Sequence, residues 1–168
     1  SLAGSPARST HGHHAVHASD GLGTLGNHGI HSQITLHGHS HASVSVDALH
    51  GGRLASLRIH DMEVLFTHGP DATALTWGCY PMAPYAGRVR SGIVHFDNVE
   101  HQLPLTLPPH AAHGTVFTQS WNVVDATESS IDLFTDLDSQ WPFGGSVSHH
   151  IELEEARIHL ELCVTAGD

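Results

Sequence analysis

Apolar and polar residues alternate along several short stretches of the chain, and this period of two constrains the fold more than any other feature. In ASVSVD, Val44 and Val46 alternate with polar residues. In RIHLELCV the alternating apolar side chains are Ile158, Leu160, Leu162 and Val164. Such a pattern places the apolar side chains on one face of a β-strand. SIDLFTDL and QSWNVVDA are weaker versions of it.

Turn-forming sequences separate these stretches. Glycine, proline and small polar residues gather at residues 50–52, 67–72, 107–114 and 141–145, and a weaker turn signal lies at 154–157. No stretch has the 3.6-residue apolar spacing of an amphipathic helix. Short alternating strands joined by turns are typical of all-β domains, so we predict an antiparallel β-sandwich or barrel.

The first part of the chain differs from the rest in composition. Residues 1–32 are mostly Gly, Ser, Ala and His, with almost no large apolar side chains. A segment of this kind cannot bury enough apolar surface to offset the entropy of ordering it. We therefore predict a flexible tail over residues 1–32 and one folded domain over residues 33–168.

The charge of the chain excludes two classes of partner. Asp and Glu number 17 against 6 Lys and Arg, which gives a net charge of −11 at pH 7 with neutral histidines. Nucleic acids and anionic membrane surfaces are themselves negative and would repel such a chain. No apolar run is long enough to span a bilayer. We expect neither nucleic acid nor a membrane as a partner.

Cysteine use indicates a reducing compartment. Cys79 and Cys163 lie far apart and form no CxxC pair, so neither a disulfide framework nor a cysteine-rich zinc site is expected. The first residues also lack the basic-then-apolar order of a secretory signal. We therefore expect a cytoplasmic protein.

The stretch CYPMAPYAGRVRSG presents an arginine, Arg88, after two prolines and a glycine. Proline stiffens a loop and glycine permits a tight backbone path, so Arg88 would be held as a planar fork of donors. The residues alone leave two interpretations equally open, a ligand contact or an ion pair at the surface. Further along, His113 precedes a turn glycine, where an exposed histidine without a function is common.

Three stretches together resemble a known family. GGRLASLRIHDMEVL, YPMAPYAGRVRSGIVHFDNVEHQL and HGTVFTQSWNVV occur in the order found in aldose 1-epimerases, the galactose mutarotase-like family. The resemblance runs from about Gln33 to the end of the chain. It implies an antiparallel β-sandwich of the large supersandwich type, and interconversion of the α and β anomers of a free monosaccharide such as galactose or glucose. It implies no metal and no organic cofactor.

The resemblance also implies roles for two residues. Arg88 matches the family arginine that hydrogen-bonds sugar hydroxyls, and His113 matches the first active-site histidine. Gly87 stands where the family usually has asparagine, which leaves the sugar preference open. The loop WPFGG contains Trp141 and Phe143, which we expect to line a sugar pocket because pyranose rings stack on aromatic rings. We expect Trp121, by contrast, to lie in the core.

The family's second histidine and its catalytic glutamate have no counterpart in this sequence. No His-Pro dipeptide occurs, and the late glutamates lie on or beside an alternating strand. Ring opening needs both a base and an acid. The chain therefore resembles the N-terminal part of a mutarotase, an incomplete β-sandwich. We expect it to be inactive by itself and to associate with itself through exposed strand edges.

Two further functions stay open at this point. HGHH and HGHSH place imidazoles two residues apart, the ligand type that zinc, nickel and copper favour, so a histidine-rich metal-binding module is one alternative. These histidines lack the buried supporting residues of an evolved metal site, and a solvated tail is the preferred interpretation. The other alternative is a carbohydrate-binding protein that retains Arg88 and His113 without catalysis.

Overall fold

A computed structural model describes residues 33–38, 41–155 and 157–167. The predicted tail and its HGHH stretch lie outside the described residues. Within those ranges the chain forms β-strands, loops and two single-turn 3-10 helices, η1 (Arg90–Gly92) and η2 (Val116–Thr118). The prediction of an all-β fold is therefore confirmed.

The first sheet contains four antiparallel strands in sequence order. They are β1 (Gln33–His37), β2 (Ala42–Asp47), β3 (Arg53–Ile59) and β4 (Met62–Glu63). Val44 and Val46 of β2 are fully buried, as their alternation predicts. The register between β2 and β3 shifts after Ser45, and a shift of this kind bends and twists a strand.

The second sheet is also antiparallel, with spatial order β12-β11-β10-β9. Its strands are β9 (Asn122–Ala126), β10 (Ser130–Asp136), β11 (Gly145–Leu153) and β12 (Ile158–Ala166). Every second residue of β11 is buried, from Val147 to Leu153. This alternation places one face of the sheet in the core and the other in solvent.

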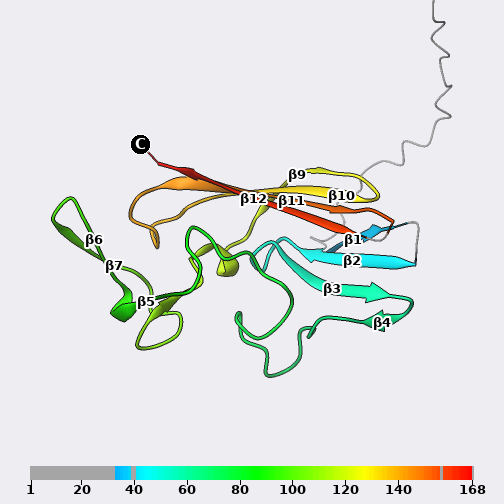
Figure 1. Cartoon of the computed structure of the whole chain (residues 1–168), viewed down its shortest axis with the longest axis horizontal. Coiled ribbons are helices and arrows are strands. Elements are labelled where there is room, and N and C mark those ends of the chain that lie inside the picture. Colours follow the sequence, from blue (N-terminus) through cyan, green and yellow to red (C-terminus); the bar gives the residue numbers. More distant parts are fainter. Residues whose placement is uncertain (1–32, 39–40, 156, 168) are drawn as a thin grey trace, which may run out of the picture.

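The two sheets pack face to face and form a sandwich with open edges, one sheet above the other in Figure 1. The core between them is a single cluster with side chains from both sheets, among them Leu36, Val44, Val46, Leu54, Ile131, Leu133, Val147 and Ile151. Burial of this apolar surface is the main stabilising contribution to such a domain.

Trp121 lies in the core, as predicted. Its side chain is buried, and its indole N–H donates to the Val116 carbonyl at 3.1 Å. The strand begins one residue later, at Asn122, and Val123 and Val124 of that strand are exposed. Trp121 therefore packs from the loop that leads into β9 and not from the strand itself.

Two short strand pairs lie beside the sandwich. β5 (Arg88–Val89) pairs with β8 (Ala111–Ala112), and β6 (Ile93–Phe96) pairs with β7 (Val99–Gln102) as a hairpin. The hairpin projects from one end of the molecule, at the left of Figure 1. Among the described residues, no helix is long and apolar enough to cross a membrane.

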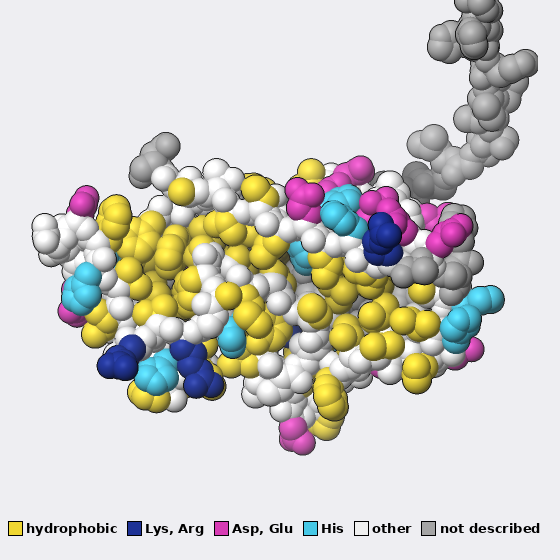
Figure 2. Space-filling view, in the orientation of Figure 1, with side chains coloured by type: hydrophobic (Ala, Val, Ile, Leu, Met, Phe, Trp, Pro, Cys, Tyr) yellow, Lys and Arg dark blue, Asp and Glu magenta, His cyan; other side chains and the backbone are white. Residues whose placement is uncertain are grey.

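Strand β12 extends the second sheet past the cover of the first. Its inner-face residues Leu160, Leu162 and Val164 keep 44%, 39% and 45% of their surface exposed, although their neighbours on β11 are buried. The predicted alternation is thus present in β12, but the apolar face that it creates is exposed. Figure 2 shows hydrophobic side chains in a broad band across this side of the molecule.

Candidate functional site

The pairing of β5 with β8 brings Arg88 and His113 to the same end of a small sheet. Arg88 lies opposite Ala112, and the next residue, His113, donates its backbone N–H to the Gly87 carbonyl at 2.9 Å. The backbones of two residues that are 25 positions apart in sequence thus lie close together, Arg88 on β5 and His113 directly after β8. We call Gly87, Arg88, His113 and Gly114 the Arg88–His113 corner.

Arg88 is exposed at this corner. In the part of the chain that the structure describes, its guanidinium has neither a hydrogen-bond partner nor an ion-pair partner. A guanidinium offers five N–H donors in a rigid planar fork and accepts no proton. Arg88 can therefore bind and orient oxygen atoms of a ligand, but it cannot act as an acid–base group.

His113 is held by an unusual backbone path. Its φ is 63°, a left-handed value that few non-glycine residues adopt, and Gly114 follows with a φ of 78°. A Cβ at Gly114 would lie 1.8 Å from the Ala83 carbonyl oxygen, so only glycine fits. The Thr115 N–H also donates to Ala83, at 2.9 Å. The histidine is therefore fixed against the loop that precedes Arg88.

The His113 ring carries a buried nitrogen without a partner. Its Nδ1 is enclosed and makes no hydrogen bond among the described residues. Buried polar atoms are nearly always paired, and an exception requires an explanation such as a role in binding or catalysis. The ring also lies 6.2 Å from the ring of Tyr80, edge to face. Imidazole titrates near neutral pH and is the usual general acid or base in enzymes.

Behind the corner lies a second arginine, Arg53, which the sequence analysis did not single out. Only 1% of Arg53 is exposed. Its guanidinium donates to four backbone carbonyls, at distances of 2.5 to 3.0 Å; these belong to His50, Ala74, Trp77 and Phe117. It also lies 4.3 Å from the centre of the Trp77 ring. Burial lowers the pKa of Arg53, and the nearby Asp47 carboxylate opposes that change.

Tyr80 connects Arg53 to His113. Its ring lies 5.4 Å from the Arg53 guanidinium and 5.3 Å from the ring of Phe117. Burial raises the pKa of Tyr80, so its hydroxyl stays protonated near neutral pH.

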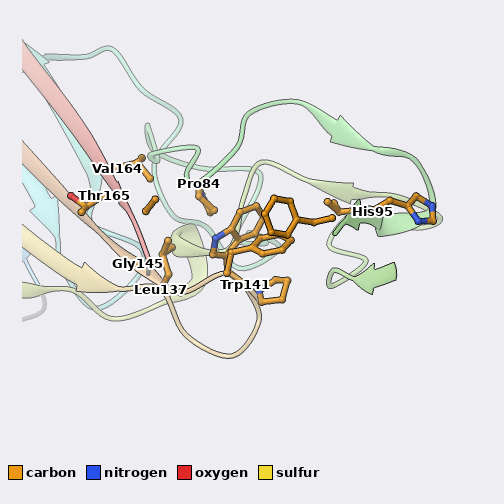
Figure 3. A pocket seen from close by; sticks show the side chains of 14 residues that line it. Pro84, His95, Leu137, Trp141, Gly145, Val164 and Thr165 are labelled. Atoms are coloured by element: carbon orange, nitrogen blue, oxygen red, sulfur yellow. The ribbon is translucent and has the colours of Figure 1, made fainter. Parts of the chain in front are cut away.

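Trp141 and Phe143 line an apolar pocket of about 940 Å³ (Figure 3). Their rings are 5.0 Å apart and nearly perpendicular, and Phe96 of the β6–β7 hairpin packs on Phe143 at 5.3 Å. Arg88 and His113 do not line this pocket. The structure thus places the four predicted site residues in two groups, a polar corner and an aromatic pocket.

Residues 83–87 join the two groups. Ala83 is bridged to Gly114 at the corner, Pro84 lines the pocket, and the Gly87 carbonyl accepts the His113 N–H. The ring of Tyr85 lies 5.8 Å from that of Trp141. The Tyr85 hydroxyl is buried without a partner in the described residues, and burial raises its pKa. A ligand that extends from the corner into the pocket would contact this segment along its length.

No group of three or more His, Cys, Asp or Glu side chains within the described ranges could hold a metal ion. HGHSH is only partly described, and its residues His37 and His41 line a polar hollow together with His60. His41 and His60 lie 5.6 Å apart, measured between ring centres. Cys79 and Cys163 are both exposed thiols.

Comparison with solved structures identifies proteins of similar fold. An Escherichia coli K12 protein proposed to be an aldose 1-epimerase superposes with a TM-score of 0.70 at 22% identity, over 80% of this chain and 46% of its own. Galactose 1-epimerase from Lactobacillus acidophilus NCFM gives 0.61 at 22% identity, over 77% and 42%. The GalM/aldose epimerase homologue from C. elegans gives 0.66 at 16% identity, over 80% and 46%.

These matches establish the fold, which is the predicted galactose mutarotase-like arrangement of antiparallel strands. The chain spans less than half the length of each of the three solved structures. No curated protein sequence matches it significantly. The family model for aldose 1-epimerase matches residues 32–168, which is most of the chain. This protein therefore belongs to the aldose 1-epimerase family.

Proposed function

We propose that the protein is an aldose 1-epimerase that interconverts the α and β anomers of a free hexose, galactose or glucose. The observation that supports the proposal is the β5–β8 pairing, in which Arg88 lies opposite Ala112 and the His113 N–H donates to the Gly87 carbonyl. A donor fork and an imidazole are the side chains that positioning a polyol and moving its protons require. One structural relative is named a galactose 1-epimerase, which supports the same substrate class.

The reaction would proceed by reversible ring opening. A base removes the proton of the anomeric hydroxyl while an acid protonates the ring oxygen, and the bond between the anomeric carbon and the ring oxygen breaks. Rotation of the open-chain aldehyde and ring closure then give the other anomer. In this scheme Arg88 holds the sugar hydroxyls and His113 transfers one of the protons. Trp141 and Phe143 would contact the apolar face of the sugar ring.

The second proton-transfer group is not evident at the corner. We propose that the 168 residues alone bind a sugar without accelerating its ring opening. We also propose a cytoplasmic location, since both cysteines are exposed thiols that a reducing compartment would preserve. Proton transfer and hydrogen bonding by side chains supply the proposed chemistry, so we propose that no cofactor takes part.

Polarimetry tests the proposal directly. Freshly dissolved α-galactose and α-glucose would be followed with the 168-residue chain and with the longest form of the protein that its gene encodes. Arg88→Ala should lower kcat/KM about 10- to 100-fold in the active form, because several charge-assisted hydrogen bonds are lost. His113→Gln should lower kcat about 100-fold or more, because an amide cannot transfer a proton. An unchanged rate in Arg88→Ala would remove Arg88 from the site.

A carbohydrate-binding protein without catalysis is the second candidate. The observation that favours it is that, among the described residues, no Asp or Glu forms a hydrogen bond or an ion pair with Arg88 or His113. Calorimetric binding of galactose or glucose that Arg88→Ala abolishes, together with anomerisation at the spontaneous rate in every form of the protein, would support this alternative over the enzyme.

A further inference from the structure

Two histidines lie side by side at the end of the first sheet that is remote from β5 in Figure 1. His41 lies directly before β2, and His60 lies in the turn between β3 and β4. The His60 N–H donates to the His41 carbonyl at 3.1 Å, so the pairing of β2 with β3 continues to these two residues. The sheet itself therefore holds the two imidazoles near each other.

The rings of His41 and His60 line one polar hollow. Their centres are 5.6 Å apart, and the rings are tilted by 33° to each other. The hollow has a volume of about 560 Å³, and His37 and Asp61 also line it. Both rings are exposed, and neither forms a hydrogen bond or an ion pair within the described ranges. Their nitrogen atoms are thus available to a ligand that enters the hollow.

Another close pair of histidines, His150 and His159, differs in this respect. The centres of these rings are 6.3 Å apart. Nδ1 of His150 donates to the Asp132 carboxylate at 2.7 Å, and Nε2 of His159 lies 3.8 Å from the Glu161 carboxylate. Each ring of this second pair therefore has a carboxylate partner, which the rings of His41 and His60 lack in the described part of the chain.

We propose that His41 and His60 bind a divalent transition-metal ion, and that zinc fits them best. Imidazole is the commonest metal ligand in proteins, and zinc binds its nitrogen at about 2.0–2.1 Å in tetrahedral geometry. A tetrahedral ion held by one nitrogen of each ring would place the ring centres about 5.2 Å apart. The observed 5.6 Å is close to that value, so small rotations of two exposed side chains bring both nitrogens to the ion.

The site has two protein ligands. No group of three or more His, Cys, Asp or Glu side chains in the described ranges could hold a metal ion, so water completes the coordination. Imidazole ligands suit zinc, nickel and copper, whereas magnesium and calcium prefer oxygen. A bound ion would tie the residue before β2 to the β3–β4 turn and thereby stabilise the first sheet. The proposal does not depend on the enzymatic function proposed above.

Urea denaturation of the full chain, with and without zinc chloride, tests the proposal. A metal that binds only the folded chain raises the midpoint of unfolding, whereas a metal that binds the folded and unfolded chains equally does not. The midpoint therefore does not respond to a histidine that binds zinc equally in both states. At about 1 mM zinc, roughly 10- to 100-fold above the Kd that we expect, the midpoint should rise by about 0.5–1.5 M urea.

His41→Asn and His60→Asn should each reduce this rise at least about 5-fold, because a single imidazole cannot chelate the ion. Asparagine suits both positions, since their φ values of 55° and 47° are left-handed and asparagine tolerates them. Without zinc, both variants should therefore unfold near the midpoint of the parent chain. His159→Asn is the matched control: His159 is also exposed and also belongs to a close pair, and this variant should keep the full rise.

Magnesium chloride at the same concentration should leave the midpoint of the parent chain unchanged. The absence of a zinc effect in the parent chain would overturn the proposal. A full rise in both His41→Asn and His60→Asn would overturn it as well. Loss of the rise in His159→Asn alone would assign the ion to the other histidine pair and contradict the site at His41.

Nuclear magnetic resonance locates the ion without any substitution. Nickel binds the same type of ligand and is paramagnetic, so a substoichiometric amount should broaden nearby amide signals. Ala42 and Ile59, the paired residues next to the two histidines, should lose intensity before Leu160, which lies beside His159. Broadening of Leu160 before Ala42 and Ile59 would overturn the proposal.

Discussion

Arg53 and Arg88 lie in opposite environments, although the ring of Tyr80 lies close both to the Arg53 guanidinium and to the His113 ring of the Arg88–His113 corner. Arg53 is enclosed, and its donors are committed to four backbone carbonyls. Arg88 is exposed, with no partner in the described part of the chain. Each of the three guanidinium nitrogens of Arg53 donates at least one hydrogen bond. Arg88 has donors to offer, and the neighbouring histidine has a buried nitrogen left unpaired.

We infer from this difference that Arg53 contributes to stability, whereas Arg88 and His113 serve ligand binding. The Arg53 guanidinium holds the loop at residues 74–77 and the turn η2, and Phe117 of η2 packs on Tyr80, whose ring in turn lies 6.2 Å from that of His113. Buried polar groups that are fully paired rigidify a structure, whereas unpaired ones cost free energy and persist where they serve binding. We infer that Arg53 fixes the frame and that Arg88 and His113 use it.

Replacing Arg53 should have the largest effect on stability. Arg53→Met keeps much of the side-chain volume but leaves four carbonyls without their donor, two of them buried. We expect the free energy of unfolding to fall by about 3–5 kcal/mol. Urea denaturation followed by tryptophan fluorescence would measure it. Arg88→Ala is the matched control and should change stability by less than about 0.5 kcal/mol. Equal losses in the two variants would remove the distinction drawn here.

A methyl group at Gly114 should have the next largest effect, because it would collide with the Ala83 carbonyl. We expect Gly114→Ala to destabilise the fold by about 2–3 kcal/mol and to displace His113. Gly87→Ala provides the comparison: Gly87 also has a left-handed φ, 77°, but a Cβ there would meet nothing within 4 Å. Its cost should be about 1 kcal/mol, that of backbone strain alone. Thermal unfolding of both variants would show whether contact or φ dominates.

Acid should produce the smallest effect, through His149. This histidine is buried, its Nδ1–H donates to the Gly52 carbonyl at 3.3 Å, next to Arg53, and burial lowers its pKa below the usual 6.5. The unfolded chain therefore takes up a proton that the folded chain refuses, and stability falls as the pH drops below about 6.5. His149→Gln should reduce that fall by up to about 1 kcal/mol per pH unit.

Its neighbour on the outer face, His150, should act in the opposite direction. The Asp132 carboxylate, 2.7 Å away, raises the pKa of His150. The stability it contributes is present at low pH and is lost as the pH rises through its folded-state pKa. Because this pair is partly exposed, we expect its contribution to be small. Denaturation at pH 5.5, 6.5 and 7.5 of His149→Gln and His150→Gln would separate the two histidines, and equal slopes would contradict the assignment.

The fold could be predicted in large part because alternation is a local signal. Val44 and Val46 on β2, and the four apolar residues of β12, occupy the faces that the pattern assigns them. Whether each face is buried, in contrast, depends on which strands the opposite sheet covers. The pattern of β12 is as regular as that of β11, yet β12 is exposed. Alternation in the sequence predicts which side chains share one face of a strand. Only the tertiary arrangement determines whether another sheet covers that face.

The sequence was enough to name the residues of the candidate site, but it did not predict how those residues are arranged in space. Motifs identified Arg88 and His113, but their adjacency depends on the β5–β8 pairing of two-residue strands too short to leave a periodic signal. Arg53 was missed because a charged residue is expected at the surface, and its four carbonyl partners come from loops distant in sequence. Trp141 and Phe143 were correctly expected in a loop, but their separation from Arg88 could not be foreseen.

Residues 83–87 are held to the corner at both ends, by the bridge of Ala83 to Gly114 and by the His113 N–H on the Gly87 carbonyl, and Pro84 between them lines the aromatic pocket. The segment that the two anchors fix is therefore also the one that supplies Pro84 to the wall of the pocket. An insertion or deletion there would break both anchor points at once. During evolution, then, the pocket can change size more readily through Phe96, Trp141 and Phe143 than through the segment itself.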